Sequence, residues 1–398
     1  MHVGEPVSAT SNLYHRTTAG RPRIESLTGL RWCAALAVFL SHNVPGGKTP
    51  LIISTFFSSG YMGVTLFFVL SGFVLTVTYG NVMAKPRMVD IWNYAVARAA
   101  RVMPLYWLVL ALVAVVWLFF GPGATTGGLW WHFLAIQAWT GDLKLAYSWN
   151  GPGWSVGVEL FLYAMFPLLV LLTGVLNSTR KVVILAVFVV ISMATLVVIF
   201  HLNGNDALPM SDPASAHRWI YRSPLLRLGD FTLGICGALI YSRERDRINL
   251  VKAAPWVAAA MAMLILGLMA TPQLLDSSSA SYDLAFAVPG AVLILSLALA
   301  PHRGIARFLG SFVLVALGEL SYAFYLIHAP VGGQFQLLGI SPNGFTPVSV
   351  TVVILALLFL VALSWLLHVA FERPARIFLR KRFSISTTRP RSQSATEG

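Results

Sequence analysis

Charged residues are scarce in this chain of 398 residues, because Asp, Glu, Lys and Arg together make up only 11% of it. A soluble domain usually carries about 25% charged residues. Hydrophobic residues instead reach 57%, and they form several runs close to the ~20 residues that a helix needs to cross a bilayer. The short alternating segments of a membrane β-barrel are missing. We therefore predict an all-α polytopic membrane protein in contact with the lipid bilayer.

Cysteine is nearly absent as well. Only Cys33 and Cys236 occur, and each lies inside an apolar run. Two isolated cysteines do not indicate a disulfide framework. No group of His, Cys and Asp residues has the spacing of metal ligands, so we expect no metal site.

Acidic residues are few, 15 against 28 Lys and Arg, which gives a formal net charge of +13. In a soluble protein such an excess can indicate binding to nucleic acid. In a membrane protein it has a simpler cause, since cytoplasmic loops collect Lys and Arg. We therefore expect no nucleic-acid partner.

Apolar segments long enough to be transmembrane helices predict a bundle of about ten spans. They cover residues 27–44, 60–80, 102–121, 153–174, 182–202, 226–242, 255–271, 284–300, 308–329 and 348–371. The further apolar piece 129–140 is rich in tryptophan and too short to cross. We predict that it is an interfacial or re-entrant segment.

The distribution of Lys and Arg predicts the orientation of the bundle. With a cytoplasmic N-terminus, 22 of the 28 lie in inner segments, five lie in or beside outer segments, and Arg31 lies inside the first span. This bias agrees with the positive-inside rule and predicts two cytoplasmic termini. We expect a multi-pass protein of the plasma membrane, and the oligomeric state is left open.

Three regions follow from this topology. Residues 1–26 form a basic cytoplasmic N-terminal segment, and residues 27–375 form the membrane domain. Residues 376–398 form a cytoplasmic tail that is polar and basic, and we predict that it is disordered.

Ionisable residues inside spans are costly, and each is a candidate functional residue. Arg31 and His42 stand at the two ends of the apolar stretch LRWCAALAVFLSHN. Their spacing of 11 residues places them on one helix face, roughly 16 Å apart along the axis. An arginine at an inner end can reach the headgroups, whereas a histidine near mid-depth is a candidate general base.

Three further motifs carry polar residues into the second, third and fourth spans. Ser71 and Gly72 allow a close approach of helices, and we favour a packing role for them. Arg98 and Arg101 share a helix face before Pro104, which we expect to break or kink the helix. Two arginines on one face suit a phosphate-bearing compound, although ordinary positive-inside charge is the alternative.

The fourth span, which we expect to begin near Trp154, carries Ser155, Glu159 and Tyr163 at intervals of four residues. These three residues form one polar stripe on a transmembrane helix. A lone buried carboxylate such as Glu159 needs a partner, which the sequence does not identify.

The ninth and tenth spans carry the remaining candidates. Ser321, Tyr325 and His328 share one face of the ninth span, and Tyr322 lies on another. His328 has either a structural or a functional role. In the tenth span we expect a structural hydrogen bond for His368.

Six motifs in order resemble the acyltransferase-3 family of integral-membrane O-acyltransferases over roughly residues 23–375. They are LTGLRWCAALAVFLSH, FFVLSGF, RAARVMPLYW, WSVGVELFLYAMFP, SYAFYLIH and ERP. The family transfers acyl groups from acyl-coenzyme A, supplied from the cytoplasm, to hydroxyls of sugars, lipids or natural products.

The resemblance assigns roles to single residues. It implies that His42 is the catalytic histidine, that Glu159 is the helix carboxylate, and that Arg31, Arg98 and Arg101 belong to the donor site. Some family members add a soluble extracytoplasmic domain. This sequence shows none, so the branch with small acceptors is favoured.

Together these observations predict that His42 takes the proton of the acceptor hydroxyl, which attacks the thioester of acyl-coenzyme A. A transient acyl-histidine is the alternative. Glu159 either orients the imidazole or balances the charge of Arg31. Substrate contact or support is expected from other polar residues, namely Ser71, Tyr163, Tyr322, Tyr325 and His328.

Acetyl is the expected acyl group, and the acceptor is either a cell-surface polysaccharide or a macrolide-like metabolite. The rival interpretation is a transporter or a lipid-binding protein that uses buried His, Glu and Arg as a proton relay. The two halves of the chain show no matching pair of broken helices, which argues against a carrier.

Overall fold

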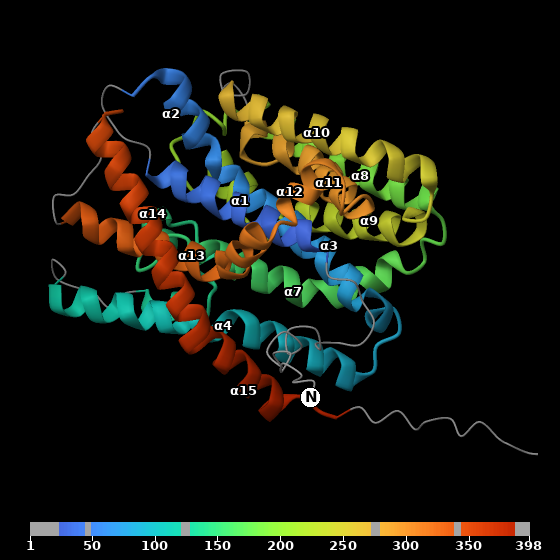
Figure 1. Ribbon diagram of the computed structural model, residues 1–398, viewed down its shortest axis with the longest axis horizontal. Helices are drawn as coiled ribbons and strands as arrows, with labels where there is room; N and C mark the ends of the chain where they lie inside the picture. Colours follow the sequence, from blue (N-terminus) through green and yellow to red (C-terminus); the bar gives the residue numbers. More distant parts are fainter. Residues whose placement is uncertain (1–23, 44–48, 121–127, 272–278, 338–343, 387–398) are drawn as a thin grey trace, which may run out of the picture.

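The computed structural model describes residues 24–43, 49–120, 128–271, 279–337 and 344–386. The regular structure in these ranges is helical throughout, without a strand. Figure 1 shows many of the long helices running roughly along the long axis of the molecule, with α4 and α10 on opposite sides of the bundle. The predicted all-α class is therefore confirmed for the described part of the chain.

The longer helices are α1 (Glu25–His42), α3 (Gly63–Met83), α4 (Met88–Phe120), α7 (Gly153–Thr173), α8 (Thr179–Leu202), α9 (Leu228–Glu244), α10 (Ile248–Ala270), α11 (Leu284–Leu299), α13 (Phe312–Leu337) and α14 (Pro347–Leu367). Shorter elements are α2 (Leu51–Ser58), η1 (Ser59–Met62), α5 (Leu129–Phe133), η2 (Gln137–Trp139), α6 (Leu143–Tyr147), η3 (His217–Tyr221), η5 (Ser279–Tyr282), α12 (Gly304–Leu309), η6 (His368–Glu372) and α15 (Arg373–Phe383).

Seven helical segments in the described residues are long and apolar enough to cross a membrane. They are Leu51–Met83, Met88–Trp117, Gly153–Thr173, Thr179–Leu202, Ile248–Ala270, Phe312–Gly332 and Pro347–Phe383. The other three predicted spans correspond to α1, α9 and α11, which are helices of 18, 17 and 16 residues. The total of ten spans and the side of the termini stay predictions.

The segment 129–140 does not form a transmembrane helix. It forms two short helices instead, α5 and η2. The hydroxyl of Tyr106 on α4 holds the segment in place by donating a hydrogen bond to the carbonyl oxygen of His132 at 2.7 Å. The amide of Gln137 donates to the same hydroxyl at 3.1 Å. The prediction that this piece is too short to cross is confirmed.

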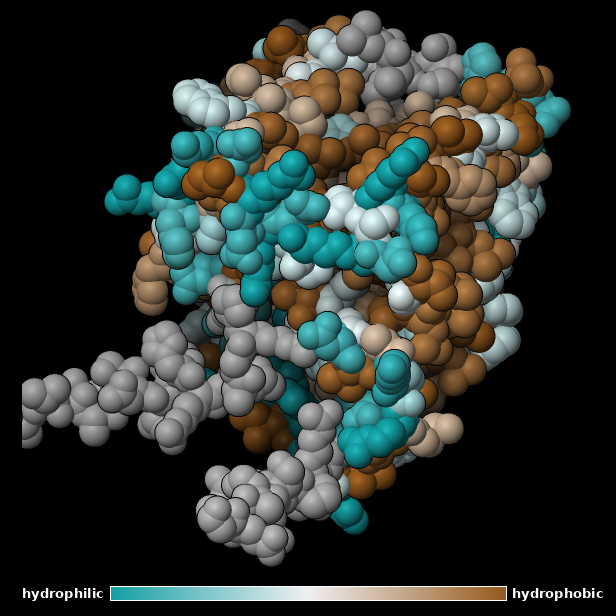
Figure 2. Space-filling view, turned by 90° about the vertical axis from the view of Figure 1, so that its right-hand side faces the viewer, coloured by the Kyte–Doolittle hydropathy of each residue, from teal (hydrophilic) through white to brown (hydrophobic). Residues whose placement is uncertain are grey.

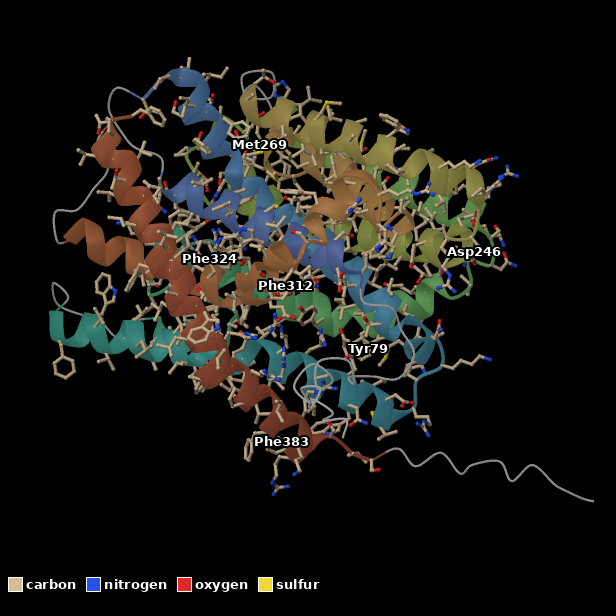
Figure 3. The ribbon with its side chains drawn as sticks, viewed as in Figure 1. Tyr79, Asp246, Met269, Phe312, Phe324 and Phe383 are labelled. Carbon is tan, nitrogen blue, oxygen red and sulfur yellow. The ribbon has the colours of Figure 1, made fainter. Side chains whose placement is uncertain are left out.

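Large apolar side chains on the flanks of the bundle are exposed, for example Val187, Phe188 and Ile191 on α8. Figure 2 shows the end of the bundle that lies on the right of Figure 1, where hydrophilic residues gather beside a hydrophobic flank. Asp246, labelled in Figure 3, and the exposed Arg245 lie at this end. An apolar flank next to a polar end is expected of a protein that lipid surrounds.

Helices α3 and α9 approach each other through glycine. A methyl group at Gly72 would lie 2.1 Å from the carbonyl oxygen of Phe231, and one at Gly234 would lie 2.1 Å from the carbonyl oxygen of Val69. Small residues let backbones of membrane helices come this close. Gly72 thus has the predicted packing environment, whereas its neighbour Ser71 forms a hydrogen bond to Glu159.

We expect Gly72→Ala to lower the stability of the folded protein by about 1–3 kcal/mol, because the added methyl group must push the α9 backbone away. The measurement is thermal unfolding of the purified protein in detergent. Gly267→Ala on α10 is the matched control, since a methyl group there meets nothing within 4 Å. Equal midpoints for the two variants would contradict the close α3–α9 contact.

The helix α4 runs from Met88 to Phe120 without a break at Pro104, and transmembrane helices tolerate such prolines when neighbours satisfy the freed backbone groups. Of the predicted break or kink, the break is therefore wrong and the kink stays a prediction. The tail predicted to be disordered from residue 376 begins as the helix α15. Asn93 holds the end of this helix through hydrogen bonds to the backbone N–H and C=O of Ile385. Residues 387–398 lie outside the described residues.

Candidate active site

A cavity of about 430 Å³ opens beside His42, at the C-terminal end of α1. His42 is exposed, although apolar side chains such as Val38 and Val64 line the same cavity. Its accessible face borders the cavity, which explains the exposure. The described residues that line the cavity are Val38, His42, Tyr61, Val64, Tyr147, Gly151, Pro152, Trp154, Met210, His217, Tyr221, Tyr282, Tyr325 and Ala329.

The contacts of His42 determine which ring nitrogen carries its proton. Nδ1 lies 2.9 Å from the carbonyl oxygen of Val38. Because a carbonyl only accepts, Nδ1 of the neutral ring must be protonated, and Nε2 keeps a free lone pair. The geometry therefore presents His42 as a base at Nε2.

A second histidine supports this arrangement from α13. Nδ1 of His328 lies 2.6 Å from the carbonyl oxygen of Tyr325 and must also be protonated in the neutral ring. Its Nε2 is then an acceptor, and it lies 3.3 Å from Nδ1 of His42. His328 is buried, with 1% of its surface exposed. It thus helps Val38 to orient the N–H of His42.

Glu159 lies in a different cluster, with the arginines. Its carboxylate accepts a hydrogen bond from Ser71 at 3.2 Å and another from Tyr163. Arg31 is close enough to interact electrostatically with Glu159, Arg98 and Tyr163. Of the two alternatives for Glu159, these contacts fit charge balance with Arg31. The described partners of the His42 imidazole are the Val38 carbonyl and His328.

Arg98 is surrounded by tyrosines. It donates to the hydroxyl of Tyr79 at 3.2 Å, and its guanidinium carbon lies 5.2 Å from the Tyr79 ring centroid and 5.8 Å from that of Tyr163. Its Nε is buried without a hydrogen-bond partner among the described residues. This guanidinium is therefore held by rings and keeps an unused donor.

Arg101 forms an ion pair with Glu372. The second carboxylate oxygen of Glu372 lies 3.0 Å from Nδ1 of His368, which is the kind of structural contact expected for this histidine. The Arg101 guanidinium carbon also lies 5.7 Å from the ring centroid of Tyr322. The hydroxyl of Tyr322 donates to the carbonyl oxygen of Val102 at 2.8 Å, so Tyr322 belongs to the arginine cluster.

The polar stripe of α7 connects the two regions. Ser155 shares a 2.8 Å hydrogen bond with the hydroxyl of Tyr325, which lines the cavity. Tyr163, eight residues further along α7 and therefore about 12 Å away, lies against Arg98. Figure 3 labels one residue beside each region: Phe324, next to Tyr325 in the sequence, and Tyr79, which contacts Arg98. Phe324 and Tyr79 lie on opposite sides of the middle of the bundle.

Arg227 is one of the five Lys and Arg residues that were counted in or beside outer segments, and it organises the cavity wall. Its guanidinium donates to the carbonyl oxygens of Tyr221 at 2.7 Å and Tyr282 at 3.2 Å. Asp230 and Asp283 both pair with it, and the Arg227 side chain is 0% exposed. Burying charges costs free energy unless they are paired, so these contacts define one compact ionic cluster.

His217 and its aromatic neighbours were not predicted to be site residues. They belong to the stretch HRWIY in the segment 203–225, between the predicted spans 182–202 and 226–242. The π-helix η3 turns His217 and Tyr221 toward the cavity. A histidine among aromatic residues in an otherwise polar loop was the available signal.

An all-helical bundle of membrane type, with a histidine cavity near one end and an arginine–carboxylate cluster deeper in its interior, defines an integral-membrane protein with a buried polar site. Residues 24–369 match the family model described as an acyltransferase domain. The chain belongs to the acyltransferase-3 family.

Two curated relatives are similar over most of the chain. Acyltransferase MdmB of Streptomyces mycarofaciens is 29% identical over 391 residues, which cover 92% of this chain and 95% of the relative. O-acetyltransferase OatA of Staphylococcus aureus is 21% identical over 330 residues, which cover 77% of this chain but only 50% of the relative. No solved structure matches the chain.

Proposed function

We propose that this membrane acyltransferase of the plasma membrane moves an acyl group, normally acetyl, from acyl-coenzyme A to a hydroxyl of a sugar-containing or natural-product acceptor. The family membership and the O-acetyltransferase relative support acyl transfer to oxygen. The observation that carries the proposal is the placement of His42: its side chain lines a cavity, and its Nδ1 faces the carbonyl oxygen of Val38, so the neutral ring has its lone pair at Nε2.

The acceptor binds in the cavity, and Nε2 of His42 takes the proton of its hydroxyl. The acceptor oxygen then forms a bond to the thioester carbonyl carbon, and the bond from that carbon to sulfur breaks. The coenzyme A thiolate takes the proton from the imidazolium. The products are the ester and free coenzyme A thiol, and His42 returns to its initial state.

The donor's phosphates bind in the arginine cluster. Three cations, Arg31, Arg98 and Arg101, face two carboxylates, Glu159 and Glu372, so the ionised cluster keeps an excess of one positive charge. Arginine forms strong, charge-assisted hydrogen bonds to phosphate. The α7 stripe offers a polar path of about 12 Å from this cluster toward the cavity, along which the pantetheine arm extends.

The test uses detergent-purified protein, acetyl-coenzyme A and a panel of hydroxyl acceptors, with release of free thiol as the readout. We expect acceptor-dependent thiol release and an ester product that is heavier by one acetyl group. A transporter or a lipid-binding protein would release no thiol. Acetyl-coenzyme A without acceptor is the blank.

Arg98→Met is expected to raise KM for acetyl-coenzyme A about 10- to 100-fold, because one charge-assisted contact of roughly 1.5–3 kcal/mol is lost. KM for S-acetylpantetheine, which lacks the nucleotide phosphates, should stay unchanged. Arg87→Met is the matched control just before the start of the same helix, since Arg87 is exposed and paired with Asp90. An equal loss with both donors would contradict a phosphate contact at Arg98.

A further inference from the structure

The walls of the cavity beside His42 are aromatic and carry no Asp, Glu, Lys or Arg among the described residues that line it. Tyr221 is at the centre of the aromatic wall. Its ring centroid lies 5.7 Å from that of Tyr61, 5.0 Å from that of Trp154 and 6.1 Å from that of Tyr282. Aromatic rings of this kind present an apolar face, and tyrosine adds a polar hydroxyl.

His217 is the second imidazole on this wall, and it comes from the outer loop rather than from α1. Nε2 lies 3.5 Å from the hydroxyl of Tyr147, at the long end of the hydrogen-bond range. Nδ1 is buried without a hydrogen-bond partner among the described residues, and only 7% of the residue is exposed. An unsatisfied buried polar atom costs about 1–3 kcal/mol. A small turn of the imidazole ring brings Nδ1 to the cavity surface, so a ligand that supplies the partner there gains affinity.

The charge state of His217 narrows the chemistry of that partner. Burial, together with the guanidinium groups of Arg222 and Arg227, lowers the pKa of His217 to about 4. The ring is therefore neutral at pH 7, and it offers one donor and one acceptor nitrogen. A hydroxyl, which both donates and accepts, pairs with Nδ1 in either tautomer.

We propose that His217 is a specificity-determining residue of the acceptor site: its Nδ1 binds a hydroxyl of the acceptor, and the uncharged aromatic wall selects neutral hydroxyl compounds with a flat apolar face over charged ones. This inference rests on the proposed function, since it takes the cavity as the acceptor site. A carboxylate or ammonium group in this cavity would lose water without gaining a charged partner from the described lining.

The test measures binding without turnover. Protein in lipid nanodiscs is dialysed to equilibrium against 4-nitrophenyl β-D-glucopyranoside or its acidic counterpart, 4-nitrophenyl β-D-glucuronide, and the nitrophenyl absorbance gives the bound fraction. Empty nanodiscs are the blank. We expect saturable binding of the neutral glycoside and binding of the glucuronide that is at least about tenfold weaker, as expected for an unpaired charge.

Two substitutions separate ligand binding from a structural role. Asn at position 217 is short enough to place its amide near the Nδ1 position, whereas Gln reaches toward the Nε2 position and Tyr147. We expect His217→Gln to weaken glycoside binding about tenfold, the value of one lost hydrogen bond, and His217→Asn to retain affinity within about threefold. His201→Gln is the matched control, because His201 is exposed and paired with Asp206 in the same outer region.

Three outcomes would overturn the inference: no saturable binding of the neutral glycoside, equal affinity for the glucuronide, or rescue by Gln instead of Asn. The last would show that His217 acts only through Tyr147. Because dialysis needs neither acetyl-coenzyme A nor a reaction, its result stands apart from the thiol-release assay. If the binding results are as expected but no acceptor gives thiol release, the proposed reaction is rejected and the inference about His217 stands.

Discussion

His42→Ala is expected to reduce acceptor-dependent thiol release by about 10²- to 10⁴-fold, the usual contribution of a positioned general base. The side chain contributes little to the fold, because its accessible face borders a cavity. Alanine removes the free Nε2 and leaves the acceptor hydroxyl without a proton acceptor. The measurement compares initial rates of thiol release for the variant and the wild type at saturating acetyl-coenzyme A.

The control for this prediction is His302→Ala, at an exposed histidine between α11 and α12. That variant should turn over at the wild-type rate. The thermal unfolding midpoint of His42→Ala should stay close to that of the wild type, which separates lost chemistry from lost folding. Normal turnover by His42→Ala would remove this residue from the mechanism.

Arg227→Met is expected to destabilise the folded protein by about 3–5 kcal/mol, because it leaves two buried carboxylates without a cation. Asp230 and Asp283 are both buried, and both pair with this one guanidinium. The change also removes the donors that hold the carbonyl oxygens of Tyr221 and Tyr282. Fluorescence-detected size-exclusion chromatography after heating measures the loss of folded protein.

A compensated variant keeps this prediction testable if Arg227→Met does not fold. Adding Asp230→Asn and Asp283→Asn removes both unpaired charges while the side-chain amides keep hydrogen-bonding capacity. We expect this triple variant to recover part of the lost thermal stability. Arg245→Met, at an exposed site, should behave as the wild type. A destabilisation that the two asparagines do not relieve would contradict the electrostatic cause.

The helical class and the positions of the apolar helices could be predicted because lipid requires long apolar runs. Helices α9 and α11 fall at the predicted positions even though they are shorter than the seven clear spans. The end of the chain was harder to predict, because α15 is basic and the contacts to Asn93 that follow it, at Ile385, join residues 292 positions apart. Composition alone does not show such a contact.

The candidate site residues were recognised from their chemistry, but their partners were not. The contact between His42 and His328 spans 286 positions in the sequence, and it depends on how α1 packs against α13. Gly318 lets these helices meet, since a methyl group there would lie 2.0 Å from the carbonyl oxygen of Thr28. Glu159 was left with two alternatives for the same reason, because helix periodicity gives its face but not its neighbour.

The polar stripe of α7 also limits which donors can work. Ser155 and Tyr163 belong to one continuous helix, so the distance between the cavity end and the arginine end is set by covalent structure and cannot shorten when other helices move. A donor anchored by its phosphates at the arginines must therefore carry its acyl group on an arm of about 12 Å, the rise from Tyr163 to Ser155, or roughly 16 Å, the rise from Arg31 to His42 along α1. Under the proposed function, a compact donor such as acetyl phosphate would occupy the charged end and leave its acetyl group out of reach of His42.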